Sequence, residues 1–216
     1  YSSRGAVSFG LGTRACILGC SGLRVTSQER RFFSSNHPLG FILFARNIST
    51  VTQVQALCDE LRDCVGWNAP ILIDQEGGRV QRLRPPLARE FLPPLAQCQR
   101  AGAQASRAMY LRFRIIAAEL QALGIDVNCA PVADIARPDT HPFLHNRCYG
   151  ETAAKVMGLA RAAANGLLDG GVVPVIKHMP GHGLGVVDSH HALPQVAATA
   201  AVLEQDDFAV FTGLND

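Results

Sequence analysis

The chain has 216 residues and a formal net charge of +2, and 48% of its residues are hydrophobic and 18% charged. This composition is typical of a soluble globular protein with a substantial buried core. The basic residues are spread along the chain rather than gathered in one block, which argues against a nucleic-acid or membrane partner. No apolar run approaches the roughly 18 residues that cross a bilayer. A small molecule is therefore the expected ligand.

The cysteines and the chain ends bear on compartment and completeness. Seven cysteines occur without a pair of CxxC motifs, and several lie in apolar runs, where a free thiol behaves as a small hydrophobic side chain. A reducing, cytoplasmic compartment is the expectation. The chain begins with Tyr1 and closes on Asp216 without a clear termination signal, so we expect a fragment of a longer protein. Residues 1–14 are expected to be a disordered lead-in, and residues 15–216 to be part of a single domain.

Short apolar runs alternate with longer amphipathic runs from Ala15 onward, which is the pattern of repeated βα units around a parallel sheet. The strand candidates are rich in Ile, Val, Leu and Phe and are bounded by Gly, Pro or polar residues. In chain order, the expected elements are strands at 15–22 and 40–46, a helix at 50–65, a strand at 69–76, a helix at 111–123, a strand at 125–135, a helix at 156–167, a strand at 171–181 and a helix at 198–211.

The helix at 50–65 shows its pattern most clearly. Ser49 or Thr50 can cap its N-terminus, and Gly66 is a residue that commonly ends a helix. Its apolar residues recur at three- and four-residue spacing, which places them on one face. These residues are Val54, Leu57, Cys58, Leu61 and Val65.

Polar side chains follow most of the predicted strands at their carboxyl ends. This arrangement is typical of the active site of a (β/α) barrel, but a doubly wound open sheet shows it too at its switch point, so the pattern alone leaves both folds open. The chain has no GxGxxG after its first strand, which argues against a dinucleotide-binding fold, and no GxxxxGK[ST] phosphate loop. The polar residues are Arg46, Asn47, Asp74, Gln75, Glu76, Asp134, Lys177 and His178.

The segment KHMPGHGLGVVDSHHALP, residues 177–194, contains four histidines and allows three interpretations. A metal site is disfavoured because Pro180 interrupts the helix that would place His178 and His182 on one face. The histidines can instead be structural, bonded to backbone carbonyls in a glycine-rich turn. The third interpretation is acid and base catalysis.

Asp188 stands two residues before His190, and this spacing suits the third interpretation. A histidine that donates a proton to a leaving group and later takes one from water needs a pKa near the working pH, and a carboxylate beside it fixes its tautomer. Three glycines would let the loop close over a substrate. They are Gly181, Gly183 and Gly185. The sequence thus predicts Asp188 and His190 as an acid/base pair.

The segment after the third predicted strand is a second candidate site. Asp74 follows an apolar run, and a glycine pair and Arg82 come next. A carboxylate with an arginine nearby can bind sugar hydroxyls, whereas an ion pair that closes a turn is the structural alternative. Arg147, in the stretch NRCYG, is a weaker candidate because an arginine before a helix is more often solvated than functional.

Taken together, these stretches resemble the bacterial β-N-acetylglucosaminidases of glycoside hydrolase family 3, the single-domain type associated with peptidoglycan recycling. The matching stretches, in chain order, are PLGFILFARNI, LIDQEGGRVQRL, APVADI, NRCYGE, KHMPGHG and DSHHALP. The resemblance implies a (β/α)8 TIM barrel, of which about five βα units would be present here. It also implies removal of terminal N-acetylglucosamine with retention of configuration, through a covalent glycosyl-enzyme.

The resemblance further implies roles for individual residues. It makes His190 the acid/base and Asp188 its partner, while His182 would shape the loop. It implies no metal and no organic cofactor. The partner would be a small sugar, a muropeptide that ends in N-acetylglucosamine. The residues assigned to the sugar hydroxyls are Asp74, Arg82, Arg147, Lys177 and His178.

The nucleophile is the main departure from the family pattern. Family members place this aspartate at the end of a later strand, and retaining hydrolysis needs it opposite the acid/base, so we expect it beyond Asp216. Asp74 is assigned to substrate, Asp134 looks structural, and Asp206 and Asp207 fall on an outer helix. We also expect the chain alone to be aggregation-prone or marginally folded, because part of a barrel leaves unpaired strand edges.

Two other functions stay open on the sequence. One is a non-catalytic remnant that binds N-acetylglucosamine without a nucleophile. The other is a β-N-acetylglucosaminide phosphorylase, because a histidine acid/base is neutral when deprotonated and repels an anionic acceptor such as phosphate less than a carboxylate does.

Overall fold

Five parallel strands form the central sheet of the computed structural model, which describes residues 12–187 and 193–215. They lie in the spatial order β1–β2–β3–β6–β7, and every adjacent pair is parallel. This order confirms the predicted succession of five βα strands. The strands are β1 (Arg14–Leu18), β2 (Pro38–Leu43), β3 (Ile71–Ile73), β6 (Val127–Asn128) and β7 (Val173–Pro174).

The observed strands are shorter than the predicted runs. β3 ends at Ile73, and the chain then forms a small antiparallel hairpin from β4 (Gln75–Gly77) and β5 (Val80–Gln81). Gly77 and Gly78 make this turn with φ values of 94° and 64°, which glycine adopts without steric cost. The polar residues at the end of the predicted run therefore leave the sheet and are available to build a site.

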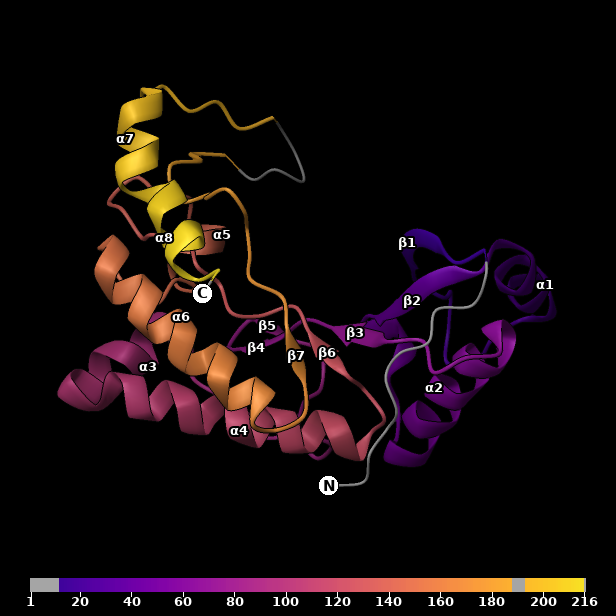
Figure 1. The fold of residues 1–216 in the computed structure, drawn as a ribbon. Coiled ribbons are helices and arrows are strands. Elements are labelled where there is room, and N and C mark those ends of the chain that lie inside the picture. The colour runs from indigo at the N-terminus through magenta and orange to yellow at the C-terminus, as the bar shows by residue number, and fades with distance from the viewer. Residues whose placement is uncertain (1–11, 188–192, 216) are drawn as a thin grey trace.

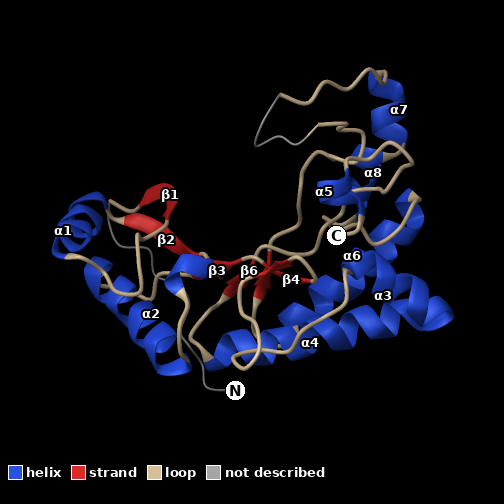
Figure 2. Ribbon diagram, turned by 180° about the vertical axis from the view of Figure 1, so that it is seen from behind, coloured by secondary structure: helices blue, strands red, loops and turns tan. Residues whose placement is uncertain are grey.

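Helices connect the strands (Figures 1 and 2). The helices predicted at 50–65, 111–123 and 156–167 are confirmed as α2, α4 and α6, whereas α1, α3 and α5 were not predicted. The helices are α1 (Ser27–Asn36), α2 (Val51–Val65), α3 (Pro94–Ala101), α4 (Ala105–Ala122), α5 (Pro142–His145), α6 (Ala153–Leu168), α7 (Ala200–Gln205) and α8 (Asp207–Gly213), with short 3-10 turns at Ala45–Asn47 and Gly102–Gln104.

Local signals explain where these helices start, stop and meet. The Thr50 side chain accepts a hydrogen bond from the Gln53 backbone N–H at the start of α2, and Gly66 ends the helix with φ 78°. Helices α4 and α6 pack against each other (Figure 1). Gly166 allows this close approach, because a Cβ there would collide with the carbonyl oxygen of Tyr110.

The last predicted helix, 198–211, is divided into α7 and α8. Asp206 interrupts it with φ −107° and ψ −80°, which are not helical values. The Asp206 side chain is 49% exposed, whereas that of Asp207 is only 2% exposed and pairs with Arg137. The expectation that both aspartates lie on an outer helix is therefore wrong for Asp207, which is buried.

Arg112 of α4 supports the hairpin from beneath. The residue is 2% exposed. Its Nη2 donates to the carbonyl oxygen of Glu76 at 2.6 Å and its Nη1 to that of Leu92 at 2.9 Å, and Nη1 also bonds the side chain of Gln97. The guanidinium lies 5.0 Å from the ring centre of Phe91. Burial lowers the pKa of Arg112 to about 10, which leaves the group charged at neutral pH.

Substitution of this arginine tests its supporting role. Arg112→Met is expected to lower the free energy of unfolding by about 2–4 kcal/mol, because the buried carbonyl of Glu76 and the partly buried carbonyl of Leu92 would lose their donor. Urea denaturation measures the change. Arg107→Met, at an exposed position on the same helix, is the control and should change stability by less than about 0.5 kcal/mol. Equal midpoints for the two variants would contradict this role.

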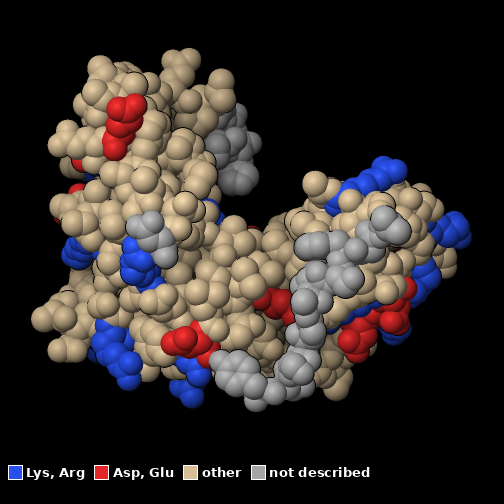
Figure 3. Space-filling view, viewed as in Figure 1, with Lys and Arg blue, Asp and Glu red and all other residues tan. Residues whose placement is uncertain are grey.

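The molecule is hollowed above the sheet, on the side toward which the strands run (Figure 3). In the same view, positive and negative side chains are interspersed over the surface and do not form one basic field. Within residues 12–187 and 193–215, no helix is long and apolar enough to cross a membrane.

Candidate active site

The carboxyl ends of β3, β6 and β7 bring charged residues together at one edge of the sheet, as expected for parallel strands. Asp74 directly follows β3, and Lys177 lies beyond β7, where it forms a parallel bridge with Val132. Asn128, at the end of β6, fixes the start of the hairpin. Its side chain accepts from the backbone N–H of Gln75 and donates to the Gln75 carbonyl, each at 3.0 Å.

Glu76 is the centre of this cluster and is fully buried. Arg147 binds it with two parallel hydrogen bonds, from Nε to Oε2 at 2.9 Å and from Nη2 to Oε1 at 2.8 Å. The ammonium of Lys177 lies 2.7 Å from Oε1. Burial alone would raise the pKa of Glu76, but Arg147 and Lys177 outweigh it and hold this pKa below its usual value. Glu76 is therefore ionised at neutral pH and fixes both cations.

Asp74 shares Lys177 with Glu76. Its Oδ1 accepts from Lys177 Nζ at 2.9 Å, and its Oδ2 accepts from Arg82 Nη2 at 3.1 Å. Burial tends to raise the pKa of Asp74, yet Lys177 and Arg82 together lower it below its usual value. The Asp74 side chain is 18% exposed, so it remains accessible to a ligand. Three cations thus face two ionised carboxylates.

His178 is oriented by Asp134, a residue that is fully buried. Asp134 Oδ2 lies 2.6 Å from His178 Nδ1, and Oδ1 accepts from the backbone N–H of His182 at 2.7 Å. Because a carboxylate only accepts, Nδ1 carries the proton, and Nε2 points toward Arg147 Nη2 at 3.3 Å. The structural role expected for Asp134 is thus a specific one, the orientation of a site histidine.

Five of the seven predicted site residues therefore converge in the structure. Asp188 and His190 fall outside the described residues. The five that meet are Asp74, Arg82, Arg147, Lys177 and His178.

Glu76 was not predicted as a site residue. The sequence does contain a signal for it: Glu76 stands two positions after Asp74, and in an extended segment residues two apart point to the same side. Among residues 12–187 and 193–215, no three His, Cys, Asp or Glu side chains are grouped so that they could hold a metal ion. The rings of His178 and His182 lie with their centres 6.1 Å apart.

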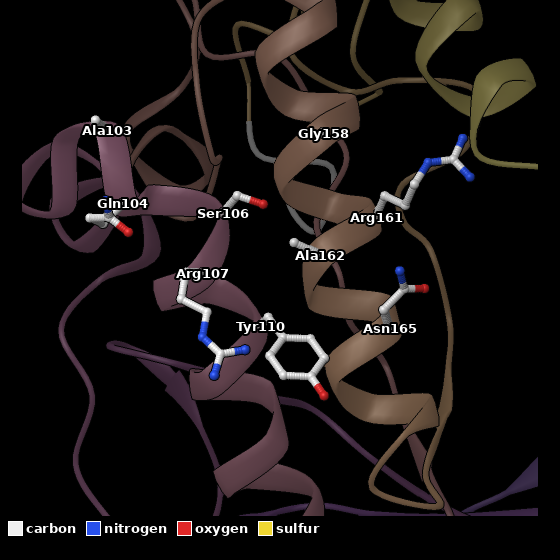
Figure 4. Close-up of a pocket in the computed structure, with 9 residues that line it drawn as sticks. All are labelled: Ala103, Gln104, Ser106, Arg107, Tyr110, Gly158, Arg161, Ala162 and Asn165. Carbon is white, nitrogen blue, oxygen red and sulfur yellow. The ribbon is translucent and has the colours of Figure 1, made fainter.

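A separate groove of about 540 Å³ lies between α4 and α6, away from the strand ends (Figure 4). The guanidinium groups of Arg107 and Arg161 do not converge on it (Figure 4). Tyr110 is engaged with Asp169 at 2.9 Å. No set of polar groups converges there as at the strand ends, so we assign the candidate site to the cluster around Glu76.

Known proteins are similar to this chain over almost its whole length. Residues 12–215 match the N-terminal domain of glycosyl hydrolase family 3. The chain belongs to this family. A β-hexosaminidase from Chromobacterium violaceum is 39% identical in an alignment of 207 residues that covers 93% of this chain and 56% of that protein. Another β-hexosaminidase, from Alkalilimnicola ehrlichii, is 35% identical over 92% of this chain and 57% of its own length.

Solved structures of the family agree with the fold. A family 3 β-N-acetylglucosaminidase from Paenibacillus sp. FPU-7 superposes with a TM-score of 0.87 at 33% identity and covers 96% of this chain and 40% of that one. NagZ from Neisseria gonorrhoeae gives 0.86 at 30% identity, over 94% and 60%. With the parallel sheet, these matches confirm the predicted TIM-barrel class of α/β fold. The chain spans little more than half the length of the curated family 3 relatives it matches.

Proposed function

We propose that the protein acts as a retaining exo-β-N-acetylglucosaminidase that removes terminal β-linked N-acetylglucosamine from muropeptide-type sugars in the cytoplasm. The observation that carries this proposal is the cluster in which Lys177 joins Asp74 and Glu76, with Arg147 and His178 beside it. This cluster lies at the carboxyl ends of the parallel strands, the end at which the active sites of (β/α) barrels are built.

The cluster has the donors and acceptors that a sugar ring needs. The ionised Asp74 can accept hydrogen bonds from two adjacent hydroxyls, and Lys177 and Arg147 can donate to others. Glu76 and Asp134 do not need to touch the sugar, because Glu76 holds Arg147 and Lys177 in place and Asp134 holds His178. A related structure supports the ligand class, since NagZ from Neisseria gonorrhoeae was solved with N-trifluoroacetyl-D-glucosamine.

The proposed chemistry uses His190 twice. Its imidazolium first donates a proton to the glycosidic oxygen as that bond breaks, while a carboxylate attacks the anomeric carbon from the opposite face. The neutral imidazole then takes a proton from water, which attacks the same carbon, breaks its bond to the carboxylate and releases the sugar with its configuration retained. Asp188 would orient the ring and stabilise its charged form.

The three carboxylates of the cluster are poor candidates for the nucleophile. Asp74 binds two cations, Glu76 binds two cations, and Asp134 binds His178 and a backbone N–H. Each of these contacts withdraws charge from the oxygen that would attack. We propose that the nucleophile is an aspartate in a continuation of the chain beyond Asp216.

Product analysis tests this function against its rivals. The protein with the proposed continuation is incubated with an aryl β-N-acetylglucosaminide, and proton NMR identifies the first sugar released. β-N-acetylglucosamine is expected, in phosphate buffer as in phosphate-free buffer. The α anomer would contradict the retaining mechanism, and a sugar phosphate would indicate a phosphorylase. Binding of the sugar without turnover would indicate a non-catalytic protein.

A further inference from the structure

The histidine-rich loop is tied down at its base, just before the proposed acid/base pair. The described part of this loop ends at Val187, the residue before Asp188. Its backbone is anchored at three points upstream. The backbone N–H of His182 donates to Asp134. The Gly183 carbonyl accepts from Thr140 Oγ1 at 2.6 Å, and the Gly185 carbonyl accepts from the backbone N–H of His141 at 3.4 Å.

An ion pair between Arg137 and Asp207 lies beneath these anchors. Arg137 binds Asp207 with two hydrogen bonds, Nη1 to Oδ1 at 3.1 Å and Nη2 to Oδ2 at 2.7 Å. The Asp207 side chain is 2% exposed and that of Arg137 is 20% exposed, so water screens this pair poorly. The backbone N–H of Arg137 also donates to Thr140 Oγ1 at 2.8 Å, which couples the pair to the Gly183 anchor.

The loop glycines pack directly on this ion pair. A Cβ at Gly181 would lie 2.7 Å from Cβ of Asp207, and φ at this position is +128°. A Cβ at Gly183 would lie 3.0 Å from Arg137 Nη1 and would collide with the Ile135 carbonyl oxygen. These glycines are therefore required for close approach, and any side chain there would push the loop away from the ion pair.

The ion pair also joins the two ends of the segment from Gly181 to Asp207. The outgoing segment contacts it at Gly181 and Gly183, and the returning segment enters α7 and then α8, which begins with Asp207. A cavity of about 350 Å³ separates the two segments, and Arg137 and Thr140 contribute to its lining. Arg137 and Asp207 thus close the base of a loop whose middle part carries Asp188 and His190.

We propose that Arg137 and Asp207 are positioning residues that set the point from which the acid/base loop reaches the substrate. This inference rests on the proposed function, because it assumes that His190 is the proton donor. Neither residue touches the sugar in this account. Loosening the pair is expected to misplace His190 and to impair proton donation more than sugar binding.

The dependence of kcat/KM on the leaving group distinguishes positioning from general stability. A 2,4-dinitrophenyl β-N-acetylglucosaminide needs little proton donation, whereas the phenyl glycoside needs much. With the protein that includes the proposed continuation, Asp207→Asn and Arg137→Ala are expected to lower kcat/KM for the phenyl substrate by about tenfold or more and for the dinitrophenyl substrate by less than about threefold. The double variant should lower kcat/KM no more than either single variant, because both substitutions break the same ion pair.

Three further variants complete the test. Arg137→Lys keeps the charge but cannot form both hydrogen bonds, so its loss in kcat/KM for the phenyl substrate should be smaller than that of Arg137→Ala. It replaces the other variants in the comparison if they fold poorly. Arg161→Ala removes a contact from α6 to the Gly213 carbonyl on α8 and leaves the loop contacts intact. It should change kcat/KM for the two substrates by the same factor. His190→Ala should show the strongest discrimination.

Each outcome bears on one of the two proposals. Equal losses on both substrates in the Asp207 and Arg137 variants, or discrimination by Arg161→Ala, would overturn the positioning role while leaving the proposed function intact. A His190→Ala variant without discrimination, or a wild-type protein without activity, would overturn the acid/base assignment and the positioning role together.

Discussion

Replacement of Glu76 by Gln is expected to lower the free energy of unfolding by about 3–5 kcal/mol at neutral pH, because Arg147 would be left with a buried, uncompensated charge and Lys177 would keep only Asp74 as its carboxylate partner. Their side chains are only 8% and 14% exposed, so water cannot replace the lost carboxylate. Equilibrium denaturation in urea measures the change. Glu90→Gln is the control, since Glu90 forms an exposed pair with Arg84 and should contribute less than about 1 kcal/mol.

The pH dependence of this loss checks its cause. The folded-state pKa of Glu76 lies below its usual value of 4.5, so its contribution is complete above about that pH and is lost as pH falls through the lower folded-state value. The difference between wild type and Glu76→Gln should therefore be constant near neutrality and shrink in acid. A difference no larger than that of Glu90→Gln at neutral pH would contradict the central place given to Glu76.

Replacement of Asp74 by Ala is expected to lower kcat/KM for an aryl β-N-acetylglucosaminide by about 10²–10⁴-fold. The reason is the loss of two hydrogen bonds from sugar hydroxyls to a charged acceptor, each of which contributes about 1.5–3 kcal/mol. Steady-state kinetics on the protein with the proposed continuation measures the change. Asp74→Asn keeps the shape and one acceptor oxygen, so it should fall between wild type and the alanine variant.

A matched aspartate at the other end of the sheet provides the control for Asp74. Asp126 precedes β6 and accepts from Arg62 Nη2 at 2.6 Å, so it is also an Asp–Arg pair but lies at the amino end of the strands. Asp126→Ala should reduce stability and leave kcat/KM nearly unchanged. If both alanine variants reduced kcat/KM equally, Asp74 would be acting through the fold and not through the sugar.

The sequence allowed correct prediction of the elements with strong periodicity. The apolar run within 69–76 and the helix before Gly66 combine an apolar pattern with clear end signals. The structure confirms the helix, and it confirms the strand over Ile71–Ile73. Helix α1 was missed because its face has little apolar character, although Thr26 and Glu29 form the capping box that marks its start. The division at Asp206 was missed because it is associated with a long-range contact, the pairing of Asp207 with Arg137.

The residues of the candidate site were also only partly predictable from the sequence. Asp74, Lys177 and His178 were predictable because polar residues that follow parallel strands meet at one edge of the sheet. Glu76 and Asp134 required the structure, because a sequence does not show that a carboxylate is fully buried or which cation it binds. The acid/base assignment of Asp188 and His190 rests on the loop pattern and stays a prediction, since both lie outside the described residues.

The strand-end cluster and His190 are proposed to form one glycosidase site. The most direct measurement is nitrophenol release from 4-nitrophenyl β-N-acetylglucosaminide by the protein with the proposed continuation, beside its His190→Ala variant. Wild-type turnover that falls by about 10²–10⁴-fold in His190→Ala, with the variant still folded, is the predicted result for a general acid. Undiminished release by His190→Ala, or no release by the wild type, would contradict the account.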